Sequence, residues 1–99
     1  MIRGTTPLLR FALPFKTETL EEAYITFVQD KEAIIEKTLE DCEKQEEALE
    51  MKLTQEDTLK FKEDRPVEIQ IRARTWGGDA IASGIMRTQA KRILKDGVI

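Results

Sequence analysis

Alternation of apolar and polar residues is the dominant pattern of this chain, and it predicts a protein built from short β-strands. The clearest case is segment 67–74, in which every second residue is apolar and the residues between are charged or polar. The same alternation predicts shorter strands at 9–13 and 49–53. Segments 23–29 and 33–39 are rich in β-branched and aromatic residues, which favours two further strands.

Turn signals separate these strands and predict how they pair. Glycines 77 and 78 lie in the segment 75–79, which predicts a hairpin turn leading into a long returning strand at 80–90, bent at Gly84. The polar residues 30–32 predict the turn of a hairpin between the second and third strands. Residues 17–22 indicate a turn or a single helical turn.

One helix start is visible in the sequence. Thr54 is a favourable N-cap residue, and Asp57 follows three positions later, where a side-chain acceptor can complete the cap. We therefore expect one short helix that runs from Gln55 to about Phe61.

A rival interpretation gives an α+β protein with a helix over about 31–53. Its apolar stripe has the 4-3-4-3-4 spacing of a heptad, and its members are Ile35, Leu39, Cys42, Glu46, Leu49 and Leu53. Glu46 interrupts the stripe, and residues 51–53 already alternate. On the residues alone the two interpretations stay open.

The composition bounds the size of the protein and its chemistry. With 99 residues, we expect a single domain over 1–91 and a C-terminal tail over 92–99. No apolar run approaches the roughly 20 residues that span a membrane, and no secretory signal is visible at the start. The absence of histidine excludes triads and metal sites that need an imidazole, and the one cysteine, Cys42, has acidic neighbours that disfavour a thiolate. We therefore expect no enzymatic activity, no metal and no cofactor.

Charge is distributed unevenly along the chain. Residues 16–71 hold 17 acidic and 8 basic side chains, whereas residues 72–99 hold 6 basic and 2 acidic ones. A nucleic-acid surface would combine basic residues with several aromatics, but Trp76 is the only aromatic in the basic segment. The pattern favours pairing of the two segments within the fold or between subunits.

Several segments together carry a resemblance to a known family. They are Met1–Pro7, Leu13–Phe15, Ala23–Phe27, Lys52–Phe61, Val67–Arg72 and Gly78–Ser83. The set resembles a family of small phage and prophage proteins of Firmicutes that are encoded among virion structural genes, and the likeness covers almost the whole chain. More distantly, it is similar to the immunoglobulin-like N-terminal domain of phage baseplate upper proteins.

The resemblance implies a fold and favours strands over the 31–53 helix. It implies a mostly β protein, a small antiparallel immunoglobulin-like β-sandwich with one short helix. Relatives carry an Asn-Gly turn where this chain has residues 29–32, and a Gly/Asn turn near 44–47; this chain has no asparagine and departs at both places. We expect the following core: Phe11, Leu13, Ile25, Phe27, Ile35, Leu49, Leu53, Leu59, Val67, Ile69, Ile71 and Ile81.

The function expected from the resemblance is that of a non-enzymatic virion structural or adaptor protein, associated with the tail or baseplate. Its partners would be other virion proteins and a second copy of itself, without a membrane or a small-molecule substrate, and its place the virion or, before assembly, the host cytoplasm. Trp76, Ile93 and Leu94 are the candidate interface residues, although Trp76 packed over its hairpin, and a tail packed on the domain, are alternatives. Other candidate functions are a carbohydrate or host-surface binding module that uses Trp76 and Tyr24, and a small nucleic-acid-binding regulator.

Overall fold

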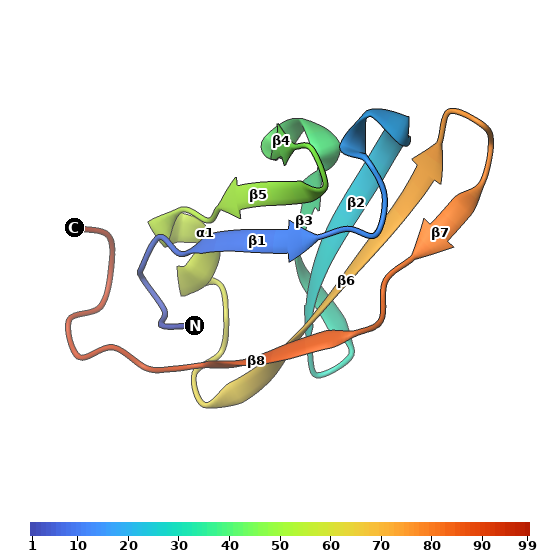
Figure 1. The fold of residues 1–99 in the computed structure, drawn as a ribbon. Helices are drawn as coiled ribbons and strands as arrows, with labels where there is room; N and C mark the ends of the chain where they lie inside the picture. The colour runs from blue at the N-terminus through green and yellow to red at the C-terminus, as the bar shows by residue number, and fades with distance from the viewer.

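Two antiparallel sheets face each other and form a sandwich (Figure 1). In the computed structural model, which describes residues 1–99, one sheet has the strand order β1-β5-β4 and the other β3-β2-β6, with β7 and β8 both paired to the remaining edge of β6. The strands are β1 (Leu8–Ala12), β2 (Leu20–Gln29), β3 (Glu32–Thr38), β4 (Glu43–Gln45), β5 (Ala48–Lys52), β6 (Arg65–Thr75), β7 (Ala80–Ala82) and β8 (Met86–Ala90). The helical elements are α1 (Gln55–Leu59) and two 3-10 turns, η1 (Thr17–Thr19) and η2 (Leu39–Asp41).

The prediction of a mostly β antiparallel sandwich with one short helix is confirmed. In an immunoglobulin constant domain the first strand pairs with the second. Here β1 pairs with β5 and β2 lies in the opposite sheet. The likeness to that fold therefore extends to the two-layer architecture and not to the strand order.

The predicted turn at 30–32 is a tight hairpin between β2 and β3. Gln29 pairs with Glu32, so Asp30 and Lys31 alone form the loop, and both have positive φ, 52° and 66°. These are the dihedrals of a type I′ turn, which matches the twist of the two strands. The chain thus forms a tight two-residue turn here without using asparagine or glycine.

The predicted N-cap of α1 is confirmed, and Thr54 and Asp57 form the two reciprocal hydrogen bonds of a capping box. Asp57 N–H donates to Thr54 Oγ1, and Thr54 N–H donates to Asp57 Oδ2, each at 3.0 Å. The helix ends at Leu59, two residues before the predicted end. There the Arg3 guanidinium donates to the carbonyl oxygens of Leu59 and Phe61, which supplies hydrogen-bond donors to carbonyl groups at the end of the helix.

The alternative of a helix over 31–53 is wrong. This stretch forms β3, η2, β4 and β5, and the break in its apolar stripe at Glu46 lies in the turn between β4 and β5. Leu49, Met51 and Leu53 are buried with the period of two that a strand requires. Packing of one strand face against the other sheet outweighed the helix propensity of these residues.

The predicted long strand at 80–90 is interrupted. β7 and β8 pair with different parts of β6, and residues 83–85 separate them. At the break the Ser83 hydroxyl accepts from Ile71 N–H at 3.0 Å and donates to Gly84 O at 2.8 Å. A side chain thus replaces a backbone acceptor at this position of the ladder, and the interruption falls in the segment that contains Gly84.

Most of the predicted core is buried between the sheets. Nine of the twelve predicted residues are buried, whereas Leu13, Leu59 and Ile81 are only half-buried. Leu13 and Ile81 line an open groove, and Leu59 lies at the end of the short helix. Residues outside the prediction complete the core: Leu20, Ala23, Leu39, Ala48, Met51, Phe61 and Ala90.

Candidate interaction surfaces

The β6–β7 hairpin tip, residues 75–79, presents Trp76 to solvent. The side chain of Trp76 is 69% exposed, so the alternative in which it packs over the hairpin is not what the structure shows. Its backbone is nevertheless held in place, because Trp76 N–H donates to Thr19 O at 3.1 Å. Gly78, with φ of 90°, supplies the left-handed residue that closes the predicted glycine turn.

The two tail residues predicted as interface lie in different environments. Ile93 is half-buried, and a β-carbon added to Gly4 would meet its Cδ1 atom at 2.9 Å, so Ile93 packs on the N-terminal segment. Leu94 is 93% exposed. The tail leaves the fold at the end opposite the β6–β7 turn (Figure 1), so Trp76 and Leu94 do not belong to one surface.

An apolar groove lies between β1 and β7, where the two sheets part. Its volume is about 420 Å³, and 11 of the 14 residues that line it are hydrophobic. Its walls come from β1, β7 and the segment 13–15, with Leu49 of β5 and Ile71 of β6 contributing from the two sheets. We refer to this feature as the β1–β7 groove.

Two exposed charges flank these features without a partner in the chain. Arg10 of β1 lines the β1–β7 groove, and Asp79 closes the hairpin tip. Neither side chain takes part in an ion pair or a side-chain hydrogen bond. Arg10 faces Glu50 across the β1–β5 ladder but forms no ion pair with it, so both the Arg10 guanidinium and the Asp79 carboxylate can meet an opposite charge on another molecule.

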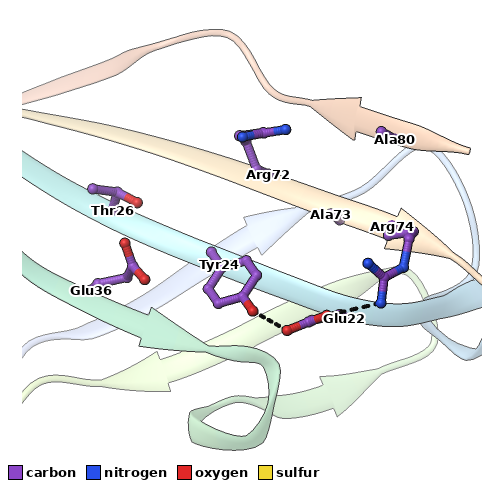
Figure 2. Close-up of a pocket in the computed structure, with 8 residues that line it drawn as sticks. All are labelled: Glu22, Tyr24, Thr26, Glu36, Arg72, Ala73, Arg74 and Ala80. Carbon is purple, nitrogen blue, oxygen red and sulfur yellow. Dashed lines mark hydrogen bonds and ion pairs between the residues drawn. The ribbon is translucent and has the colours of Figure 1, made fainter.

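A polar recess of about 410 Å³ lies on the outer face of the larger sheet, around Tyr24 (Figure 2). The Tyr24 hydroxyl donates to Glu22, and Arg74 donates to Glu22 at 3.0 Å and to Glu21 at 2.6 Å. The hydrogen bond to Glu22, and then the charge of that carboxylate, raise the pKa of Tyr24, so the phenol stays protonated at neutral pH. Tyr24 keeps 38% of its surface exposed.

The same recess combines a ring face with donors and acceptors. Arg72 projects from β6 and Glu36 from β3, and neither forms an ion pair in the chain. Thr26 contributes a hydroxyl beside them. An aromatic ring bordered by carboxylates and guanidinium groups suits a hydroxyl-rich ligand such as a saccharide.

The acidic side chains and the single cysteine are arranged as follows. No group of three or more Cys, Asp or Glu side chains is arranged to hold a metal ion. Cys42 is free and half-buried, and its Sγ lies 3.6 Å from Thr38 O. Burial raises the pKa of the Cys42 thiol, and the nearby Asp41 charge adds to the effect.

Part of the basic C-terminal segment pairs with the acidic middle of the chain. Arg74 bridges to Glu21 and Glu22, and Arg87 lies 3.2 Å from Glu68 across the β6–β8 pair. The charge asymmetry seen in the sequence is therefore in part internal to the larger sheet. No helix has the length and apolar content needed to cross a membrane.

Comparison with known proteins adds no relative to this description. The chain matches no protein-family model, no curated protein and no solved structure.

From the sequence, Trp76 had two open interpretations, exposed at an interface or packed over its hairpin, and the β1–β7 groove was missed. Its lining residues come from β1, the 13–20 segment, β5, β6 and β7, which are far apart in the sequence. One signal was available, since 11–15 is a nearly unbroken apolar run for a strand that lies at a sheet edge. A run of this kind indicates apolar surface beyond what one sheet face needs.

Proposed function

We propose that this protein is a non-enzymatic structural or adaptor module that works through protein–protein contacts in a phage or prophage virion, at the tail or baseplate. The observation that carries the proposal is the exposed, backbone-anchored Trp76 at the same edge of the molecule as an open apolar groove. Tryptophan is enriched among the residues that dominate binding energy at protein interfaces.

The surface chemistry supports contact as the mode of action. Covering an apolar groove or a large exposed aromatic side chain with another surface removes apolar area from water, and this lowers the free energy of the complex. Exposed apolar residues elsewhere, such as Ile85 and Leu94, add further places for contact. Backbone hydrogen bonds of the strands and of the β6–β7 turn hold the Trp76 tip in place.

The virion assignment comes from the sequence resemblance, which extends over almost the whole chain. The tail or baseplate placement follows from the same likeness. Multi-copy assemblies of this kind are built from repeated contacts between small, rigid modules, and a 99-residue sandwich suits that use.

The direct test is to look for the chain in purified particles. Mass spectrometry of virions produced by the source phage or prophage should find this protein at a fixed ratio to the tail proteins. A Trp76→Ala variant that keeps the native fold, supplied in its place, should be incorporated less. Absence of the wild-type chain from purified particles would contradict the proposal.

The polar recess around Tyr24 favours a second candidate function, saccharide binding. Sugars stack on exposed aromatic rings and hydrogen-bond to carboxylates and guanidinium groups, and the recess supplies both. A glycan array should then show binding that Tyr24→Ala abolishes and that Trp76→Ala leaves intact, because Trp76 is not among the residues that line the recess. An array without binding, or binding that Tyr24→Ala does not change, rules this candidate out.

A further inference from the structure

We propose that the β1–β7 groove receives the β6–β7 hairpin tip of a second copy of this chain, with Trp76 entering the groove and Asp79 meeting Arg10. This inference rests on the proposed function, because it names the partner of one contact surface. It commits to self-association, which the proposed function alone does not require.

The hairpin tip is ordered before any partner arrives. Besides the bond from Trp76 to Thr19, Thr75 N–H donates to Asp79 O at 2.9 Å, and Gly78 N–H donates to Thr75 O at 2.9 Å. Asp79 N–H also donates to the Thr75 hydroxyl at 3.1 Å. A tip held by four hydrogen bonds loses little conformational freedom on docking, which is the condition under which an exposed indole contributes most.

The groove offers the surface that an indole requires. Its volume of about 420 Å³ lies within the usual range of sites for small organic groups, roughly 300–1,000 Å³. The lining is apolar except at its rim, where Arg10 and Ser83 lie. A tryptophan buries roughly 150–250 Å² of surface when it is covered, and an arginine at the rim can stack on the ring.

The charges beside the two features are complementary. Asp79 is three residues from Trp76 in the tip, and Arg10 neighbours Phe11 in the groove wall. Both are exposed, and neither has a partner in its own chain. An aspartate delivered with the indole would therefore find an unpaired guanidinium at the rim, whereas an apolar segment without a carboxylate would leave Arg10 unpaired.

The tip and the groove lie at one edge of the molecule, which permits a symmetric dimer. β7 begins at Ala80, directly after the tip, and Ile81 and Ala82 of the same strand line the groove. A two-fold axis beside β7 lets each copy insert its tip into the groove of the other, so every contact occurs twice. Two tryptophans account for only part of the roughly 1,200–2,000 Å² of a stable interface, so we expect a concentration-dependent dimer.

The first test is sedimentation equilibrium of the full chain and of Trp76→Ala. The variant should weaken the dimer at least about 30-fold in dissociation constant, the size typical of an interface hot spot. Leu94→Ala is the matched control, since it removes an even more exposed apolar side chain at the opposite end of the fold and should leave the dimer unchanged. Thermal unfolding checks that both variants keep the native fold.

The second test exchanges the charges. Arg10→Asp and Asp79→Arg should each weaken the dimer about tenfold or more, because each places like charges together twice, and the double variant should restore it. Lys95→Asp, an exposed charge reversal in the tail, is the control for a general effect of net charge. Rescue by the double variant cannot arise from misfolding.

The outcomes separate this inference from the proposed function. A wild-type chain that is monomeric at all concentrations, or a dimer that these variants do not alter, overturns the inference. In either case, detection of the chain in purified virions still supports the proposed function. A Trp76-dependent dimer that is absent from virions supports the inference and contradicts the proposed function.

Discussion

The Lys37 ammonium lies 3.1 Å from Asp57 Oδ2, so that one ion pair joins strand β3 to the first turn of helix α1. Both side chains are shielded from water, with 23% and 9% of their surface exposed. The same carboxylate oxygen accepts from Thr54 N–H in the capping box. Asp57 therefore fixes the start of the only α-helix and its attachment to the larger sheet at once.

This arrangement predicts an acid-sensitive contribution to stability. Burial raises the pKa of Asp57, but the hydrogen bonds from Thr54 and from Lys37, with the charge of Lys37, lower it by more, so the pKa lies below its ordinary value. A depressed carboxyl pKa gives stability that is fully present above the unfolded value, about 3.9, and is lost as the pH falls through the folded value.

Asp57→Asn should therefore flatten the acid limb of the stability curve. We expect the variant to lose about 1–2 kcal/mol at neutral pH and less as the pH falls below about 4. Urea unfolding between neutral and acid pH measures the difference. Glu56→Gln, an exposed carboxylate in the same turn, is the control, and equal pH dependence in Asp57→Asn and wild type would contradict the prediction.

Lys31→Gly should stabilise the protein. Lys31 has φ of 66°, a left-handed conformation that costs a residue with a β-carbon about 1–2 kcal/mol and glycine almost nothing. We expect the free energy of unfolding to rise by about 1 kcal/mol. Lys31→Ala removes the same side chain but keeps the β-carbon, so it should bring no gain; equal stability of the two variants would count against a strained turn.

Gln29→Leu should destabilise the protein by about 2 kcal/mol. The Gln29 amide is buried, donating to Lys62 O at 2.9 Å and accepting from Lys62 N–H at 2.7 Å. Leucine leaves both backbone groups without that partner. Urea unfolding gives the magnitude, and faster hydrogen exchange at the Lys62 amide gives the location. Gln89→Leu, on an exposed position of β8, should change neither quantity.

Cys42 should react slowly with thiol reagents in the native state. Its raised pKa leaves less thiolate at neutral pH than an ordinary cysteine has, and the residue is half-buried. The rate of modification by a chromogenic disulfide should increase strongly when the protein is unfolded in urea. Asp41→Asn, which keeps an acceptor for the Thr38 cap, should increase the native rate modestly; a native rate equal to the unfolded one would refute the prediction.

Local chemistry was readable from the sequence. The capping pair Thr54 and Asp57 lies three residues apart, so both partners are visible in one short window. The alternation in β6 was equally clear, because that strand pairs on both sides and buries Val67, Ile69 and Ile71 on one face. In these two cases neighbouring residues determine the structure, and the prediction was confirmed.

Contacts between distant residues were not readable. Ser83 interrupts the strand at 80–90 by bonding to Ile71, and Gln29 is buried because it satisfies Lys62. Ile93 was predicted as interface, and its packing against Gly4 depends on how the two terminal segments meet. The β1–β7 groove was unreadable for the same reason: its lining residues are far apart in the sequence, and no short segment contains more than part of them.

The break at residues 83–85 also limits how this protein can polymerise. An uninterrupted strand over 80–90 would give the larger sheet a long free edge, onto which further copies could add strand by strand without end. The break leaves pieces of three and five residues, and Arg3 N–H and Met1 O bond to Lys91 beyond the second piece. This side of the larger sheet therefore offers an added strand only short stretches of free edge.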